Sequence, residues 1–301
     1  MIAPAAAAAV ERAAPACLLC TSTRSGPSWL GSTVYDGKVF TYLECLECGS
    51  LFCDPMPDAE TLGRMYGPSY GATGEDAAVE DPKQPLRVVE WLAARTPGTF
   101  IDYGCGGGHL LVEAKRLGWT ATGVEFDPGV AAAVERRIGI RVYDRPSQPE
   151  LIRGGAADVV HLGDVLEHLT DLDGELRDVL RLVKPGGHLI AQGPLEANTT
   201  LFTAVLRGWR RARQPAAADM APYHVTLATA QGQQALFARV GLRTVEFSMH
   251  EVDWPAPSVL EWGDLRHLRR VGMFALRRLS RLVTALSGAR FGNRYFYVGR
   301  R

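Results

Sequence analysis

The stretch Asp102-Tyr103-Gly104-Cys105-Gly106-Gly107-Gly108 decides the fold of this chain. It overlaps residues 99–103, whose aromatic and β-branched side chains predict a strand. Glycine at 104, 106 and 108 lets the backbone turn sharply and approach a ligand closely. The residues that follow predict a helix, and the first N–H groups of a helix face outward without partners. The stretch therefore predicts a ligand site between a strand and a helix.

Strand and helix patterns alternate from residue 98 onwards. Short β-rich runs are separated by stretches in which apolar residues recur at helical spacing. This alternation is typical of an α/β fold with a doubly wound sheet. The predicted strands are 99–103, 120–125, 140–143, 158–162, 188–192 and 244–249, and the predicted helices are 59–66, 110–117, 128–137, 174–183 and 231–240, with a turn at 184–187 that ends the fourth helix.

The residues around the glycine turn favour a nucleoside ligand without a pyrophosphate. A dinucleotide fingerprint needs glycine where this chain has His109 or Leu111. Glu125 ends the second predicted strand of the alternating region, and its carboxylate can accept hydrogen bonds from both hydroxyls of a ribose. An ordinary surface carboxylate is the alternative, but position, strand context and residue type together favour ribose binding.

Four of the six cysteines form two pairs, Cys17/Cys20 and Cys45/Cys48, with 24 residues between the pairs. This spacing is typical of a tetrahedral zinc site, and disulfides or free thiols are the alternatives. Asp36-Gly37, between two β-rich runs, predicts a hairpin turn. Four thiolates leave no open position for a substrate, so we expect a structural zinc ion in a small zinc ribbon.

The overall composition excludes several classes of protein. The 301 residues carry 33 basic and 33 acidic side chains, so the global charge of a dedicated nucleic-acid binder is absent. No apolar run is long enough to predict a membrane-spanning helix, and the alanine-rich residues 1–9 lack the cationic start of an export signal. We therefore expect a cytoplasmic protein with no nucleic-acid partner.

Four motifs in the chain resemble those of class I S-adenosylmethionine-dependent methyltransferases. They are the glycine turn at 102–108, Gly123-Val124-Glu125-Phe126-Asp127, Val165-Leu166-Glu167-His168-Leu169 and Leu182-Val183-Lys184-Pro185-Gly186-Gly187. The third motif is similar to the branch of this family with a Glu-His pair after the fourth strand. The resemblance covers residues 98–250 and implies a Rossmann-like, mostly parallel, seven-stranded sheet that binds S-adenosylmethionine.

The amino-terminal segment also resembles part of this family. The resemblance is carried by the cysteine pairs, by Cys48-Gly49-Ser50-Leu51-Phe52 and by Asp54-Pro55-Met56-Pro57. A subset of the family joins such a zinc-binding head to the methyltransferase core, and several members of that subset act on sugars or polysaccharide precursors. The expected organisation is a disordered tail at 1–15, a zinc-ribbon module at 16–57, a linker with lid helices at 58–97 and the methyltransferase domain at 98–301.

The resemblance assigns roles to individual residues. Asp102 would lie beneath the methionine part of the cofactor, although it could also cap a helix. Gly104 and Gly106 would line the path of the cofactor, and Glu125 would bind its ribose. The remaining cofactor contacts would be Phe126 against the adenine and the backbone of Leu162, Gly163 and Asp164 at the sulfonium end.

We expect the acceptor to be a hydroxyl of a small molecule or saccharide precursor. A hydroxyl has to lose its proton, and histidine suits that task near neutral pH. His168 and His224 are the candidate bases, and for each a structural role is the alternative; Tyr66 and Tyr70 lie where similar enzymes fold a lid, or they simply pack. The alternative functions are a non-catalytic interaction module and an RNA methyltransferase.

Residues 266–301 contain ten arginines and no carboxylate. A helix is predicted over 265–287, and a second basic stretch, 207–213, follows the apolar residues 201–206. We expect the apolar stripes of both segments to pack on the enzyme body or a second subunit, with the arginines in solvent. Contact with an anionic membrane surface, or attraction of a phosphorylated acceptor, is the alternative. The apolar stripe of the first helix is Leu268, Val271, Ala275, Leu279, Leu282 and Leu286.

Overall fold

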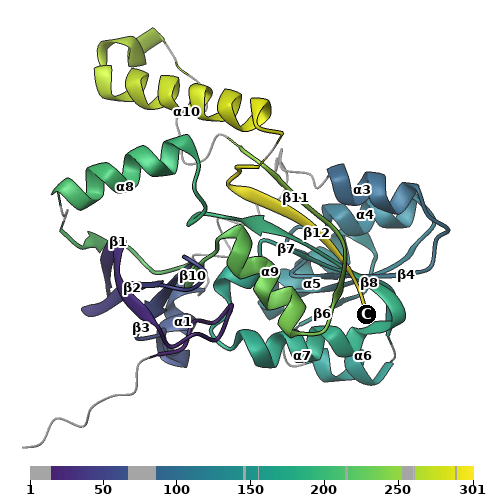
Figure 1. The fold of residues 1–301 in the computed structure, drawn as a ribbon. Coiled ribbons are helices and arrows are strands. Elements are labelled where there is room, and N and C mark those ends of the chain that lie inside the picture. Colours follow the sequence, from purple (N-terminus) through teal and green to yellow (C-terminus); the bar gives the residue numbers. More distant parts are fainter. Residues whose placement is uncertain are drawn as a thin grey trace, which may run out of the picture.

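The computed structural model places two β-sheets and their helices (Figure 1). The structure describes residues 15–66, 86–144, 147–154, 156–213, 216–252, 260, 262–288 and 290–301. Residues 1–14 of the expected amino-terminal tail, and Tyr70, therefore lie outside the described residues.

The larger sheet has seven strands in the order β11-β12-β8-β7-β4-β5-β6. Its central strands pair in parallel, whereas β12 is antiparallel to both of its neighbours. This arrangement confirms the predicted doubly wound, mostly parallel, seven-stranded sheet. The strands are β4 (Thr99–Tyr103), β5 (Thr120–Val124), β6 (Val142–Tyr143), β7 (Ala157–Gly163), β8 (Val183–Pro194), β11 (Arg243–His250) and β12 (Arg294–Arg300).

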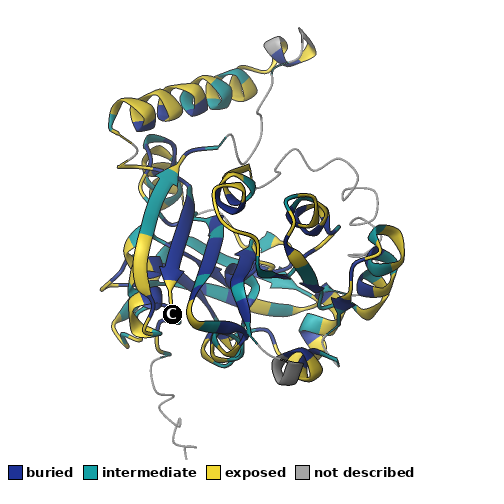
Figure 2. Cartoon of the chain, turned by 90° about the vertical axis from the view of Figure 1, so that its right-hand side faces the viewer, coloured by how far each residue is buried: buried dark blue, intermediate teal, exposed yellow. Residues whose placement is uncertain are grey.

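Helices cover both faces of this sheet, and its strands are largely buried (Figure 2). Two hydrophobic clusters result, because successive strand residues point to opposite faces: Phe100 joins one cluster and Ile101 the other. The first cluster contains α3 (Leu86–Ala93), α4 (His109–Arg116) and α5 (Pro128–Ile138); the second contains α6 (Gln148–Gly154), α7 (Leu172–Leu182) and α9 (Ala230–Arg239).

The helices begin where the sequence places capping side chains. The Asp127 carboxylate accepts a hydrogen bond from the N–H of Val130, and Asp171 caps α7 in the same way. One prediction needs correction at the end of α7. Residues 184–187 do not form a turn outside the sheet but belong to β8, in which Val183 already pairs with Ala157 and the Lys184 ammonium contacts the Asp158 carboxylate.

The smaller sheet has the order β10-β3-β2-β1-β9. Its hairpin turn has positive φ at both Asp36 (51°) and Gly37 (72°), as the Asp-Gly pair predicts. The sheet extends beyond the expected module at 16–57, because two of its strands come from the segment between β8 and α9. The strands are β1 (Ser25–Tyr35), β2 (Lys38–Cys45), β3 (Leu51–Asp54), β9 (Ala218–Asp219) and β10 (Thr226–Leu227).

Two basic helices, α8 (Leu201–Arg213) and α10 (Leu268–Leu286), lie beside each other at one end of the molecule (Figure 1). The expectation that the apolar stripe of α10 packs on the enzyme body is wrong. Leu268 is 85% exposed and Leu286 is 80% exposed. The face that α10 buries is polar instead, since Ser280 and Thr284 each donate a hydrogen bond of 2.6 Å to the Glu251 carboxylate.

Among the described residues, no helix is both long enough and apolar enough to cross a membrane.

Candidate functional site

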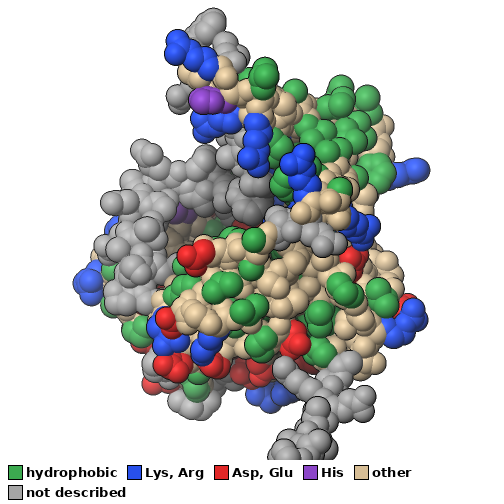
Figure 3. All heavy atoms as spheres, turned by 90° about the vertical axis from the view of Figure 1, so that its left-hand side faces the viewer, with side chains coloured by type: hydrophobic (Ala, Val, Ile, Leu, Met, Phe, Trp, Pro, Cys, Tyr) green, Lys and Arg blue, Asp and Glu red, His purple; other side chains and the backbone are tan. Residues whose placement is uncertain are grey.

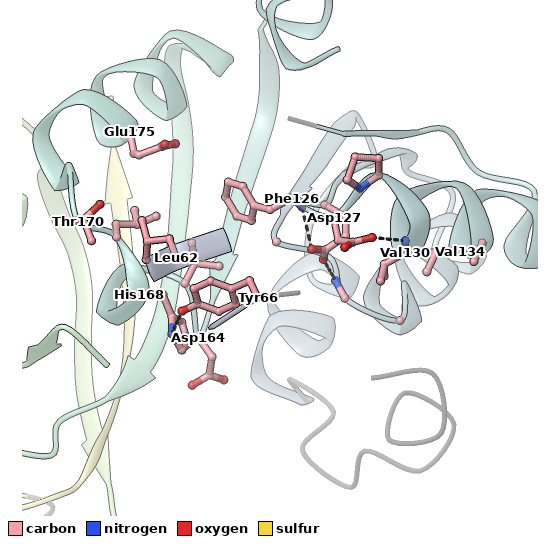
Figure 4. A pocket seen from close by; sticks show the side chains of 18 of the residues that line it. Leu62, Tyr66, Phe126, Asp127, Val130, Val134, Asp164, His168, Thr170 and Glu175 are labelled. Carbon is pink, nitrogen blue, oxygen red and sulfur yellow. Dashed lines mark hydrogen bonds between the residues drawn. The ribbon is translucent and has the colours of Figure 1, made fainter. Parts of the chain in front are cut away.

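A cavity of about 650 Å³ opens at the carboxyl ends of β4, β5 and β7. Helix α1 (Ala59–Met65) covers it, and Figure 4 shows Leu62, Tyr66 and His168 on one side of the cavity with Val130 and Val134 on the other. The position agrees with the rule that ligands bind at this edge of open α/β sheets. Its volume is within the range of ordinary ligand pockets.

The glycine turn forms the floor of the cavity. Gly104 has φ of 82°, and a Cβ atom there would lie 2.5 Å from Cγ2 of Val165. Gly106 has φ of 47°, and a Cβ atom there would meet nothing within 4 Å. Position 104 thus requires glycine for packing as well as conformation, whereas position 106 leaves the floor open for a ligand.

Glu125 lies beside this floor. One of its carboxylate oxygens accepts a hydrogen bond of 2.9 Å from the N–H of Gly106, and the other accepts one of 2.7 Å from the N–H of Phe126. Burial raises the pKa of Glu125 above its usual range, while these backbone donors act to lower it. A carboxylate has about four acceptor positions, so two remain for the hydroxyls of a ribose.

The wall next to Glu125 is apolar and suits a flat aromatic ring. Phe126 lies edge-on to Tyr103, with ring centroids 5.5 Å apart. Further along, α5 contributes aliphatic side chains from Val130, Ala133 and Val134. These groups can hold an adenine through apolar contact, and the adjacent acidic and backbone groups can hold the rest of an adenosine.

Three expected cofactor residues do not line the cavity. Asp102 is 3% exposed, and its carboxylate is 2.7 Å from Nδ1 of His161, its Cα partner on β7. Leu162 is buried in the hydrophobic core, and a Cβ atom at Gly163 would meet the His161 ring. The register of β4 and β7 therefore uses Asp102 within the sheet, and of the segment 162–164 only Asp164 reaches the cavity wall.

His168 lies in the cavity wall, in the short helix η1 (Leu166–His168). Its Nδ1 is 2.8 Å from the backbone carbonyl of Tyr223 and 3.1 Å from the hydroxyl of Tyr66. A carbonyl only accepts, so Nδ1 carries the hydrogen and Nε2 keeps its lone pair. Burial lowers the pKa of His168 to about 4, so the ring is neutral near pH 7.

His224 lies next to His168 rather than in the cavity wall. Their ring centroids are 4.8 Å apart, and Nδ1 of His224 is 2.7 Å from the Glu196 carboxylate. Hydrogen bonding and charge from Glu196 raise the pKa of His224 although burial opposes this. The sequence analysis did not single out Glu196. The one signal that could have identified it is the position of an acidic residue just after β8.

Glu167 is the second residue that sequence reasoning left without a role. Its side chain is 7% exposed, and its Oε1 has no hydrogen-bond partner among the described residues. Burial raises its pKa. One candidate ligand atom from each of Glu167, His168 and His224 lies within 4.8 Å of the others, so the structure brings both predicted histidines together with this carboxylate.

The four paired cysteines converge as the spacing predicts. The Sγ atoms of Cys17 and Cys48 are 3.8 Å apart, and those of Cys20 and Cys45 are 3.5 Å apart. Four sulfurs at 2.3 Å from one tetrahedral zinc ion would stand about 3.8 Å from each other. All four are free cysteines, and their sulfurs all lie within 4.8 Å of one another, so the cluster is of a size that suits one zinc ion.

Comparison with known proteins places the chain in a family. The sequence model described as "Methyltransferase domain" matches residues 80–283, more than half of the chain. The chain is 37% identical over 116 residues to a ubiquinone biosynthesis O-methyltransferase of Methylobacterium nodulans, covering 37% of this chain and 44% of that protein. It is 33% identical over 162 residues to a ribosomal protein L11 methyltransferase of Cupriavidus metallidurans, covering 52% and 49%.

A solved structure has the same fold. It is the Burkholderia thailandensis 1,6-didemethyltoxoflavin-N1-methyltransferase with bound substrate and S-adenosylhomocysteine, at a TM-score of 0.52 and 14% identity, covering 90% of this chain and 99% of that one. The chain spans about half the length of the curated relatives it matches.

The chain therefore belongs to the methyltransferase domain family. Its motifs and its seven-stranded sheet are of the kind that class I S-adenosylmethionine-dependent methyltransferases share.

Proposed function

We propose that the protein transfers a methyl group from S-adenosylmethionine to a hydroxyl of a small molecule or saccharide precursor. One observation carries the proposal: a single cavity has Glu125 and an apolar wall at one end and His168 at the other. The matched O-methyltransferase relative also supports a small-molecule hydroxyl. The second matched relative is named for a ribosomal protein, so the acceptor class has to be tested directly.

The cofactor would lie along the glycine turn. Glu125 would accept hydrogen bonds from its ribose, Phe126 and α5 would contact its adenine, and the Asp164 carboxylate would face its positive charge. When bound, S-adenosylmethionine supplies a methyl group already activated by a sulfonium, so the protein's task is alignment and exclusion of water. Leu62 on α1 and Tyr66, directly after its end, would cover the bound molecule.

The acceptor hydroxyl would lie beside His168. As the oxygen–carbon bond forms and the sulfur–carbon bond breaks, the hydroxyl loses its proton and S-adenosylhomocysteine is left as the neutral thioether product. The Nε2 lone pair of His168 is available at this point, because the carbonyl of Tyr223 holds the hydrogen on Nδ1. Such positioned groups contribute about 10²–10⁴-fold in rate.

The test is a methyl-transfer assay on a panel of phenols, sugars, nucleotide sugars, amines and RNA, with calorimetry of S-adenosylmethionine binding alongside. We expect turnover with hydroxyl acceptors, and His168→Ala should lower turnover about 10²-fold or more while leaving cofactor affinity nearly unchanged. Methylation of amines or RNA alone would refute the hydroxyl proposal. An unchanged rate in His168→Ala would remove this residue from the chemistry.

We also propose that Cys17, Cys20, Cys45 and Cys48 hold one structural zinc ion. The sulfur distances and the two turns support it: the N–H of Thr21 bonds to the carbonyl of Cys17, and the N–H of Gly49 bonds to the carbonyl of Cys45, each at 2.9 Å. These turns aim both sulfurs of a pair at one point, as in other two-pair zinc sites. Folding and metal binding would then be linked.

The outward face of α10 supports a further partner, an anionic membrane surface. Figure 3 shows hydrophobic side chains and Lys or Arg side chains gathered over α8 and α10, with acidic side chains lying mainly below them. Leu279 and Leu282 are 51% and 54% exposed, and Arg278 and Arg281 are exposed beside them. Apolar and cationic groups on one helix face suit insertion at the headgroup level of anionic lipids.

A further inference from the structure

Glu167, His168 and His224 form a compact cluster beside the cofactor cavity. Glu167 and His168 belong to η1 after β7, whereas His224 comes from the segment that precedes β10. Nε2 of His168 is 4.0 Å from Oε1 of Glu167, and the candidate ligand atoms of all three residues lie within 4.8 Å of one another.

Both imidazoles of the cluster have Nδ1 occupied by an acceptor. The backbone carbonyl of Tyr223 accepts from His168, and the Glu196 carboxylate accepts from His224. Each neutral ring therefore presents Nε2 with a free lone pair. Histidines that bind metals have this arrangement, in which the second nitrogen donates to a carbonyl or a carboxylate and fixes the orientation of the ring.

Glu167 supplies what two histidines lack, which is an oxygen donor. Its side chain is 7% exposed, and Oε1 has no hydrogen-bond partner among the described residues. A buried polar atom without a partner is costly, so such an atom points to a missing ligand. The Asp164 and Glu196 carboxylates add negative charge nearby, while Arg294 neutralises Asp164 through a contact of 2.7 Å.

We propose that Glu167, His168 and His224 bind one divalent first-row transition-metal cation. Nitrogen and carboxylate donors together suit Mn²⁺, Fe²⁺ or Zn²⁺. Donors around such an ion stand about 3–3.5 Å apart, and the candidate atoms lie up to 4.8 Å apart, so the farthest pair needs to close by about 1.5 Å on binding. The two histidine side chains are 23% and 29% exposed, which leaves coordination positions open toward the cavity and solvent.

This inference rests on the proposed function, because the ion would act on the acceptor. The acceptor oxygen would occupy an open position and lose its proton to solvent, since a bound cation lowers the pKa of an attached hydroxyl. That oxygen then forms the bond to the methyl carbon while the sulfur–carbon bond breaks. With the ion bound, His168 and His224 would hold it and the proton would go to solvent; in the metal-free protein, Nε2 of His168 is the proton acceptor proposed above.

Titration with Mn²⁺ followed by electron paramagnetic resonance tests the site. The full chain is first given one equivalent of Zn²⁺, which the four thiolates take in preference, and unbound or weakly held Zn²⁺ is then removed because it would compete with Mn²⁺ for the histidines. We expect one further Mn²⁺ per chain. Glu167→Gln and His224→Gln should weaken its affinity at least about tenfold. His188→Gln is the matched control, since this histidine packs against Trp91 and should leave Mn²⁺ affinity unchanged.

Calorimetry with S-adenosylmethionine shows that each variant is folded. Measuring Mn²⁺ binding and methyl transfer separately then distinguishes the metal site from the proposed function. Absence of Mn²⁺ binding to the wild type at millimolar concentration, or unchanged affinity in both cluster variants, would overturn the metal site. Methyl transfer that persists undiminished after metal removal would overturn its role on the acceptor while leaving the proposed function intact. Mn²⁺ binding without transfer to any hydroxyl would support the site and refute the proposed function.

Discussion

Glu125 is fixed beside the glycine turn, because its two oxygens accept hydrogen bonds from the N–H groups of Gly106 and Phe126. We expect Glu125→Ala to weaken S-adenosylmethionine binding by about 1–3 kcal/mol, the range for lost hydrogen bonds to a charged group. Isothermal titration calorimetry measures the change. Glu135→Ala, which removes an acidic side chain paired with Arg141 on the surface, is the control and should bind normally. Equal affinities would rule out the ribose role.

The same residue gives a pH dependence. Burial raises the pKa of Glu125 above its usual range, and only the ionised carboxylate accepts both hydroxyl hydrogens. Cofactor affinity should therefore fall as the pH drops through this raised pKa. Binding measured between pH 5 and 8 in the wild type and in Glu125→Gln checks this expectation. The variant should lack the acidic decline, and a decline shared by both would assign it to another group.

At the scale of the elements, we expect the stability of the two cysteine turns, Cys17–Cys20 and Cys45–Cys48, to depend on a bound zinc ion. Cys45→Ser removes one of four converging sulfurs, so we expect bound zinc to fall from one ion per chain and the melting temperature to drop. Metal analysis and thermal unfolding measure both. Cys53→Ser is the control, because Cys53 lies in β3 outside the cluster. Metal-free protein with unchanged melting temperature would refute the structural zinc site.

Helix α10 should bind anionic lipid through its outward face. Leu282→Glu combined with Leu286→Glu adds charge where the structure exposes leucine, so we expect co-sedimentation with phosphatidylglycerol vesicles to fall strongly. Val112→Glu, on the exposed surface of α4, is the control and should not change it. Phosphatidylcholine vesicles should bind the wild type weakly. A dimer in solution that the double variant dissolves would instead show that a second subunit covers this face.

At the scale of the whole molecule, the cysteine-containing head (residues 16–57) and the core that carries the seven-stranded sheet share one hydrophobic cluster. Leu19 and Cys48 of the head pack with Phe237 of α9, and the Ser50 and Thr229 hydroxyls are 3.0 Å apart across the boundary. The head sheet also takes β9 and β10 from the segment between β8 and α9. We therefore expect head and core to unfold together.

Gly232 tests this coupling. A Cβ atom there would lie 2.3 Å from Oγ of Ser50 and 2.9 Å from Cδ1 of Leu19. Gly232→Ala should therefore separate α9 from the head and lower stability by about 1–3 kcal/mol. Gly272→Ala, in α10 with nothing within 4 Å of the added atom, should be neutral or slightly stabilising. Two separate thermal transitions in the wild type, or an unchanged melting temperature in Gly232→Ala, would contradict the coupling.

The amino-acid sequence alone determined the parallel strands from β4 to β8, the glycine turn, the position of Glu125 and the convergence of four cysteines, but β12, α6 and the bounds of α3 were not predicted. Each of the predicted features depends on neighbours close in the chain: a periodicity, a cap, a turn or a spacing. Strand β4, for instance, has the bounds that its β-rich residues predict.

Only the tertiary structure decided which distant groups meet. The register of β4 and β7 pairs Asp102 with His161 and so keeps this carboxylate out of the cavity wall. The fold brings His224 to Glu167 and His168, and Glu251 binds the polar face of α10 so that its leucines point outward. No local pattern encodes these contacts, because a side chain's partner depends on how separate elements pack, and that is fixed by the whole chain at once.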